Sequence, residues 1–124
     1  MGALGASLVL GVIWGFWHLP KYLPPNDSSL LPWMMIKVLA DAVIYTWVFN
    51  NTRGSLLLTS ILHAAGNTAG VFLPIASTAS TAGVGAYITA IALGLVVAVT
   101  VVFVAGPARL ARAKPLPDAG QAAG

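Results

Sequence analysis

Four long apolar runs alternate with short polar or proline-containing stretches along the chain. The runs cover Ala3–Leu19, Leu30–Phe49, Ser55 to about Leu73, and Ala86–Ala105. A helix of about 20 apolar residues is about 30 Å long, which matches the hydrocarbon core of a bilayer. The pattern therefore predicts an all-α protein, a polytopic membrane helix bundle of about four transmembrane helices.

Serine, proline and glycine residues indicate where these helices begin and end. Ser28 or Ser29 is placed to cap the second helix, and Pro32 fits its first turn, where a missing N–H costs nothing. Residues 50–54, Asn-Asn-Thr-Arg-Gly, predict a short polar turn. Residues 76–85 are rich in Ser, Thr, Ala and Gly and predict a loop.

Charged residues are few, and their positions indicate how the chain is oriented. Only 7% of residues are charged, whereas soluble domains carry about 25%. With four helices, the side that holds both termini carries Arg53, Arg109, Arg112 and Lys114, and the opposite side carries Lys21. Because loops rich in Lys and Arg stay in the cytoplasm, we expect both termini there, in a multi-pass protein of the cell membrane.

Two regions of different character follow from this pattern. We expect a transmembrane helical domain over residues 1–106 and a cytoplasmic, disordered tail over residues 107–124, which is rich in small residues and proline. The net charge of +3 is scattered at helix ends and in the tail, so it does not indicate nucleic acid as a partner. The chain has no cysteine, which excludes disulfides, thiol catalysis and cysteine-ligated zinc.

The first run carries a face of small and polar residues that ends in a histidine. Spacings of three and four residues place on one helical face Ser7, Gly11, Trp14, Gly15 and His18. The two glycines allow another helix to approach closely. His18 is a candidate functional residue, and the alternative is a histidine that only lies at the membrane interface.

A second polar stripe runs along the third apolar run, and it consists of Thr59, His63, Gly66, Asn67 and Gly70. His63 and Asn67 are four residues apart, so their side chains share a face. His63 lies near the middle of its helix, where an imidazole needs a partner. The alternative to a functional role is a His–Asn pair that bonds a neighbouring helix and only stabilises the bundle.

The remaining two runs offer less chemistry. Lys37, Asp41 and Tyr45 share a face of the second run, and an intrahelical ion pair between Lys37 and Asp41 accounts for the two charges. The fourth run holds only Thr89 and Thr100 as polar residues, and we expect it to face lipid.

Two histidines and an asparagine therefore form the candidate site, and we predict that His18, His63 and Asn67 converge in one cavity of the bundle. An imidazole can activate a water or bind a metal, and His and Asn can donate hydrogen bonds to an oxyanion. Two histidines alone are a weak metal signal, because catalytic zinc usually has three protein ligands.

The first and third apolar runs, which carry His18 and His63, resemble parts of the CPBP family. This family comprises the CAAX proteases and bacteriocin-processing enzymes and is also called the Abi family. That family has three motifs on three membrane helices, EExxxR, FxxxH and HxxxN. The second resembles Trp14-Gly15-Phe16-Trp17-His18, with Trp14 where the family usually has Phe, and the third resembles His63-Ala64-Ala65-Gly66-Asn67. The resemblance covers roughly Leu4 to Leu73, and the fourth run fits the family's final helix.

The resemblance implies an intramembrane endopeptidase that hydrolyses peptide bonds of membrane-associated or prenylated proteins and peptides. It implies that His18 and a glutamate of the first motif activate water, and that His63 and Asn67 hold the oxyanion. The family has also been described as metal-dependent, which implies His18 and His63 as ligands of a divalent metal such as zinc.

The chain contains no glutamate, and its carboxylate side chains are those of Asp27, Asp41 and Asp118. It therefore resembles the C-terminal half of such an enzyme. We expect an N-terminal half as its partner and no proteolysis by this chain alone. Two other classes stay open: a non-catalytic membrane protein such as a bacteriocin self-immunity factor, and a haem or metal carrier that uses the two histidines.

Overall fold

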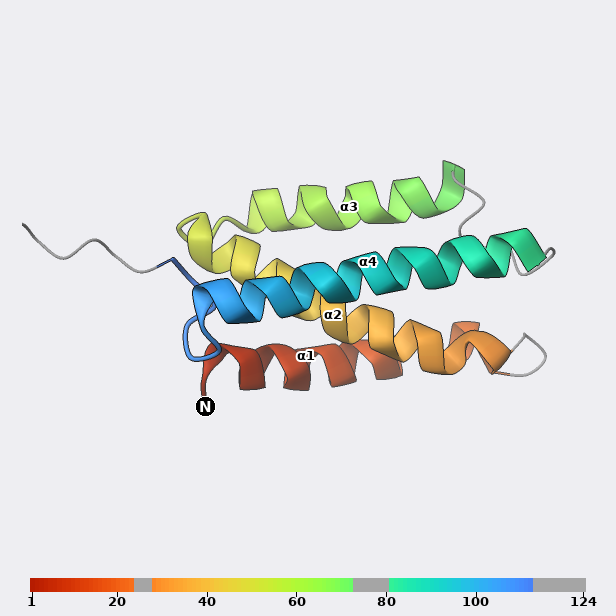
Figure 1. The fold of residues 1–124 in the computed structure, drawn as a ribbon, viewed down its shortest axis with the longest axis horizontal. Coiled ribbons are helices and arrows are strands. Elements are labelled where there is room, and N and C mark those ends of the chain that lie inside the picture. Colours follow the sequence, from red (N-terminus) through yellow and green to blue (C-terminus); the bar gives the residue numbers. More distant parts are fainter. Residues whose placement is uncertain (24–27, 73–80, 113–124) are drawn as a thin grey trace, which may run out of the picture.

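The computed structural model describes residues 1–23, 28–72 and 81–112, and their regular structure is entirely helical (Figure 1). The four α-helices are α1 (Ala3–His18), α2 (Leu31–Asn51), α3 (Leu56–Phe72) and α4 (Thr81–Ala105). Two short 3₁₀ turns, η1 (Leu19–Lys21) and η2 (Ser28–Leu30), flank the connection between α1 and α2. The predicted all-α bundle of four helices is confirmed.

Helix α2 is the centre of the bundle. It packs against α1, α4 and α3, and Figure 1 shows α1 and α3 on opposite sides of it. The two helices that carry the candidate histidines are therefore held together through α2.

Three of the helices are long and apolar enough to cross a membrane. The candidate spans are Ala3–Lys21, Ser28–Asn51 and Val84–Ala105. Helix α3 has 17 residues and is not among these spans, which require at least 18 residues in one helix. The structure therefore supports a multi-pass membrane protein, and a fourth crossing by α3 stays a prediction.

The start of α2 differs from the expected serine cap. Leu30 occupies the N-cap position without a side-chain hydrogen bond, because Ser28–Leu30 form the 3₁₀ turn η2 that leads into the helix. The prediction for Pro32 is confirmed, since a proline lies in the first turn of α2. The missing N–H of this proline has no partner to lose at that position.

The structure also differs from the prediction at two loops. Helix α2 continues through Asn50 and Asn51, and the turn starts at Thr52. Helix α4 begins at Thr81, so residues 81–85 of the predicted loop are helical, while residues 76–80 lie outside the described residues. No proline lies within 81–85, so nothing in this segment stops the helix from starting early.

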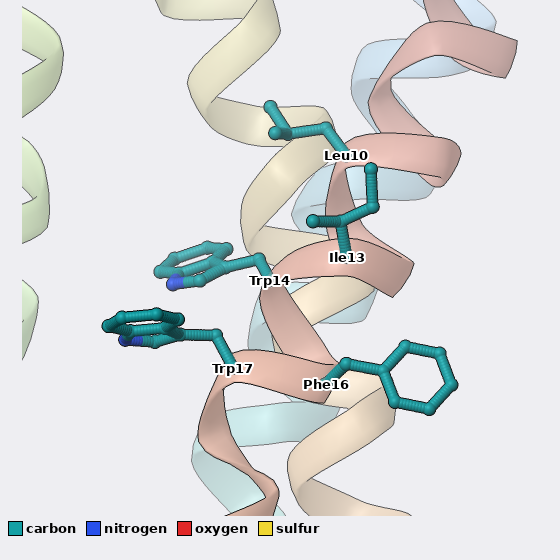
Figure 2. Close-up of a pocket in the computed structure, with 5 residues that line it drawn as sticks. All are labelled: Leu10, Ile13, Trp14, Phe16 and Trp17. Carbon is teal, nitrogen blue, oxygen red and sulfur yellow. The ribbon is translucent and has the colours of Figure 1, made fainter.

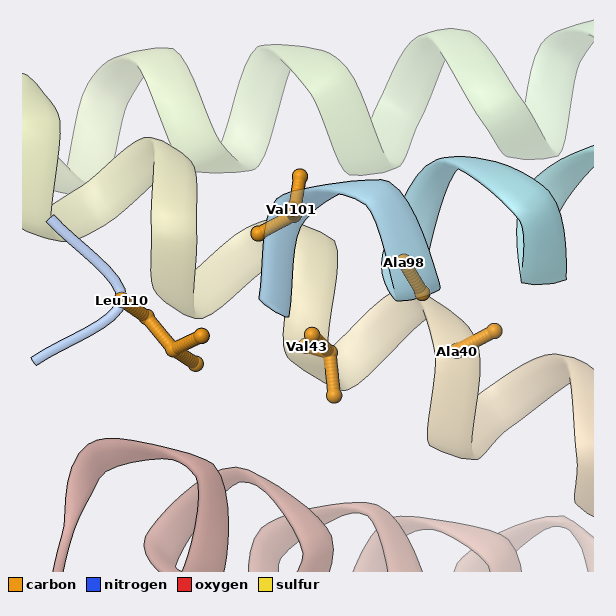
Figure 3. Packing of buried hydrophobic residues seen from close by; sticks show 5 residues of the cluster. All are labelled: Ala40, Val43, Ala98, Val101 and Leu110. Carbon is orange, nitrogen blue, oxygen red and sulfur yellow. The ribbon is translucent and has the colours of Figure 1, made fainter. Parts of the chain in front are cut away.

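A tightly packed core joins α2, α4 and the segment after α4 (Figure 3). Its buried members are Ala40, Val43, Ala98, Val101 and Leu110. Helix α4 therefore buries one face against α2, while apolar side chains such as Leu93, Val96 and Phe103 stay exposed on the rest of the helix. Its small and β-branched residues allow this close packing.

The segment after α4 folds back over the ends of the helices. Gly106 has a φ of 74°, a left-handed conformation that ends α4 at little cost for glycine. The carbonyls of Pro107 and Ala108 then accept hydrogen bonds from the first backbone N–H groups of α1, those of Leu4 (3.0 Å) and Ala3 (2.9 Å). These bonds satisfy donors that no earlier turn of the helix can reach.

Side chains of α2 fix the same segment. Asn50 Nδ2 donates to the carbonyl of Arg109 (2.8 Å), and Asn51 Oδ1 accepts from the backbone N–H of Arg112 (2.9 Å). Leu110 is fully buried. Residues 107–112 are therefore packed, although the sequence predicts a disordered tail from residue 107; residues 113–124 lie outside the described residues.

Glycines place α1 directly on α2, and this contact leads to a prediction. A Cβ at Gly11 would lie 3.2 Å from the backbone Cα of Leu39 and 3.2 Å from Cβ of Ala42. The nearest atom is Leu39 Cδ2, at 3.0 Å. We expect Gly11→Val to lower the stability of the bundle by about 1–3 kcal/mol, because this methyl group can move aside but the Leu39 Cα and the Ala42 Cβ cannot. Thermal unfolding in detergent measures this loss.

Gly94→Val is the matched control, because a Cβ at Gly94 meets nothing within 4 Å. We expect its unfolding temperature to stay close to that of the natural chain. Equal losses in the two variants would show that close approach of α1 and α2 does not explain the glycine.

Candidate active site

Four rings from three helices meet at one side of α2. The indole of Trp14 lies 5.6 Å from the His18 ring, 5.8 Å from the Tyr45 ring and 5.3 Å from the His63 ring, measured between centroids. Tyr45 and His63 contact each other edge to face, at 5.8 Å and 89°. We call these four residues the ring cluster.

His18 is the last residue of α1, one helical turn beyond Trp14. Its Nδ1–H donates a hydrogen bond of 2.8 Å to the backbone carbonyl of Trp14. In the neutral imidazole this bond leaves the lone pair on Nε2. His18 is therefore set to accept a proton through Nε2.

His63 and Asn67 bond each other along α3, as their four-residue spacing predicts. Asn67 Nδ2 donates to His63 Nε2 at 3.1 Å. Since the amide nitrogen can only donate, Nε2 is the acceptor and the proton of the neutral ring lies on Nδ1. His63 Nδ1–H and the second amide hydrogen of Asn67 are the further donors of this pair.

The predicted site residues come together through Trp14. Both imidazoles contact its indole, and Asn67 joins the group through His63. Within the described residues no hydrogen bond links His18 to His63, so the two imidazoles share a neighbour rather than touching. His63 is half-buried and Asn67 is exposed, which places the pair at the border of the ring cluster and not in an enclosed cavity.

The polar residues of α4 lie apart from this group, as predicted. Thr89 and Thr100 are exposed, and their hydroxyls donate to carbonyls of their own helix, those of Gly85 and Val96. They do not contribute to the ring cluster.

Sequence reasoning placed Trp14 on the face of the first run that ends in His18, and Tyr45 on the charged face of the second run. It did not predict that both rings contact His63. The predicted ion pair between Lys37 and Asp41 is present on α2, but Tyr45, one turn further along the same face, reaches the histidine of α3. The signal in the sequence was the aromatic ring of Tyr45, four residues after Asp41 on the same helical face.

A shallow hollow adjoins the ring cluster on α1. It has a volume of about 660 Å³ and is lined by Leu10, Ile13, Trp14, Phe16 and Trp17. Figure 2 shows Trp14 and Trp17 projecting to one side of α1 and Phe16 to the other. Trp14 therefore belongs both to the ring cluster and to an apolar surface.

The described residues do not assemble a complete metal centre. No three side chains of His, Cys, Asp or Glu come together in the described ranges. His18 and His63 supply two imidazoles around Trp14, whereas catalytic zinc usually takes three protein ligands. We therefore derive no chemical step through a metal.

Comparison with known proteins agrees with the motifs. A family model described as type II CAAX prenyl endopeptidase Rce1-like matches residues 1–69, a range that includes His18, His63 and Asn67. No curated protein and no solved structure matches the chain significantly. Because the family match covers more than half of the 124 residues, the chain belongs to the Rce1-like family of type II CAAX prenyl endopeptidases.

Proposed function

We propose that this chain supplies the histidine and asparagine part of the active site of an intramembrane endopeptidase. Its substrates would be membrane-associated or prenylated proteins and peptides. The observation that carries the proposal is the approach of His18 and His63 to one indole, with Asn67 bonded to His63. The family match supports peptide bonds as the target.

The hydrogen bonds support a separate role for each histidine in this proposal. His18 Nε2 accepts a proton from a water as that water attacks the peptide carbonyl. A glutamate of an EExxxR helix is its acidic partner. His63 Nδ1–H and the free amide hydrogen of Asn67 donate to the oxygen that becomes negative in the tetrahedral intermediate. Breakdown of the intermediate returns the proton to the leaving amine.

Cleavage by a reconstituted pair of chains tests this proposal. Residues 1–124 are co-expressed with the N-terminal half of a close relative that carries EExxxR, and a membrane peptide is offered with and without a prenyl group. We expect cleavage by the pair, and preference for the prenylated peptide would identify it as a CAAX-type substrate. No cleavage of either peptide by a pair that co-purifies would reject the proposal.

A non-catalytic membrane role, such as bacteriocin self-immunity, is the second candidate. It is favoured by one observation: Asp41 is the only carboxylate side chain within the described residues, and it is paired with Lys37. Protection of cells that survives His63→Ala, together with no cleavage by the reconstituted pair, would support this role instead.

The orientation of the bundle is a further proposal, and it leads to a labelling prediction. Arg53, Arg109 and Arg112 flank the end of the bundle where α2 meets the segment after α4, and positive charge favours the cytoplasm. We expect a cysteine at Ser28 to react with an impermeant reagent added to intact cells, and a cysteine at Ala108 to react only after lysis.

Both positions are exposed, and the natural chain has no cysteine, so the background is low. Labelling of Ala108→Cys in intact cells, with Ser28→Cys protected, would reverse the orientation. Labelling of both from one side would contradict the membrane-spanning arrangement of α2.

A further inference from the structure

Tyr45 is the side chain through which α2 contacts Trp14 of α1 and His63 of α3. Its ring lies 5.8 Å from the indole of Trp14 on α1 and 5.8 Å from the imidazole of His63 on α3. The contact with His63 is edge to face, at 89°, the geometry that aromatic quadrupoles favour. By contrast, the His18 ring contacts Trp14 and is not among the rings that touch Tyr45.

The backbone of α3 lies in van der Waals range of the Tyr45 hydroxyl. A Cβ at Gly66 would lie 3.7 Å from the Tyr45 hydroxyl oxygen, so the phenol extends along the turn between His63 and Asn67. Helix α3 packs mainly on α2, and the neighbours of His63 on its own helix, Leu62 and Ala64, are exposed. Besides Asn67 and Tyr45, the side chain that contacts the His63 ring is Trp14, at 5.3 Å and a tilt of 56°.

We propose that Tyr45 is a positioning residue that fixes the plane of the His63 imidazole. This inference rests on the proposed function for its catalytic consequence, because His63 is assigned there as an oxyanion donor. The ring of Tyr45 contacts the imidazole at right angles, and Asn67 donates a hydrogen bond to Nε2. With both restraints in place, the direction of Nδ1–H is defined before a substrate arrives, which is the preorganisation that oxyanion stabilisation requires.

Nuclear magnetic resonance of the imidazoles tests the positioning without any activity. The chain has two histidines, so His18→Gln assigns their signals in detergent micelles. We expect Tyr45→Ala to shift and broaden the His63 ring signals while leaving those of His18 near their natural positions. Tyr45→Phe keeps the ring and is expected to restore the His63 signals.

Tyr22→Ala is the matched control, since Tyr22 is also half-buried but packs with Leu30 and Tyr87 away from the ring cluster. It should leave both histidines unchanged. Unchanged His63 signals in Tyr45→Ala would overturn the proposal. Equal shifts of both histidines would also overturn it, because they would indicate a general loss of structure.

Cleavage by the reconstituted pair tests the catalytic consequence. Misplacement of a catalytic group by about 1 Å can cost about 10²-fold in rate, so we expect Tyr45→Ala to lower kcat by about that factor with little change in KM. Tyr45→Phe should retain most of kcat. A loss in Tyr45→Phe as large as that in Tyr45→Ala would assign the effect to the hydroxyl and reject positioning by the ring.

The two measurements separate failure of this inference from failure of the proposed function. If the pair does not cleave peptides but Tyr45→Ala still disturbs His63 alone, the proposed function fails and the positioning stands. If the pair cleaves and Tyr45→Ala has neither effect, the function stands and the positioning fails.

Discussion

Replacement of His18 by alanine is expected to lower peptide cleavage by the reconstituted pair about 10²–10⁴-fold, the usual contribution of a general base. The loss should appear in kcat, because His18 acts on water through Nε2 while its Nδ1–H is already bonded to the carbonyl of Trp14. Initial rates at saturating peptide measure the effect directly.

Two controls separate this chemistry from packing. Thr100→Ala removes a hydroxyl that bonds only its own helix, at the carbonyl of Val96, and should leave kcat unchanged. Thermal unfolding of His18→Ala should stay close to that of the natural chain, since the residue ends its helix and is only half-buried. Full activity in His18→Ala would remove the residue from the mechanism.

The helices could be predicted from the hydrophobic pattern, because the residues within and next to each helix determine where it begins and ends. Pro20 follows α1 and Pro32 lies in the first turn of α2, so the observed ends lie within two residues of the predicted ends for both helices. The start of α4 was harder to predict from the sequence, because the composition of residues 81–85 is compatible with either a loop or a helix. Their helical state follows from continuity with α4.

The pairing of His63 with Asn67 was likewise a local prediction, since helical geometry alone places residues four apart on one face. The ring cluster was not local. Trp14, Tyr45 and His63 come from three helices, and periodicity says which face is polar but not which face of another helix it meets. Tyr45 was therefore read only as an extension of the charged face of α2.

The order of the segment after α4 escaped sequence reasoning for the same reason. Composition suggests a flexible tail, but Leu110 is fully buried against α2 and α4. Asn50 and Asn51, which were expected in a turn, continue α2 and bond the backbone of residues 109–112. These bonds depend on helix ends that only the folded bundle brings together.

The isolated chain is expected to cleave peptides at a rate near background, and addition of an EExxxR helix in trans is expected to raise that rate at least about 10²-fold. In the proposed mechanism His18 activates water together with a glutamate carboxylate, and the sequence contains no glutamate. Oxyanion donors such as His63 and Asn67 contribute about 10²–10³ each, but they do not remove the proton from water.

Asp41 is the one described carboxylate that could replace the missing glutamate, and its surroundings argue against that role. Lys37 forms an ion pair with it along α2, which satisfies both charges within the same helix. Substituting both residues, as Lys37→Met with Asp41→Asn, avoids leaving a single unpaired charge in the membrane. We expect the double variant to keep the activity of the reconstituted pair.

The comparison of three mixtures shows which carboxylate assists His18. Natural residues 1–124 with the EExxxR half should cleave, the same mixture with both glutamates changed to glutamine should not, and the Lys37→Met, Asp41→Asn chain with the natural EExxxR half should. Cleavage by the isolated chain that disappears in the double variant would identify Asp41 as the base. That result would contradict the split site, because one chain would then hold the carboxylate, the imidazoles and the oxyanion donors together.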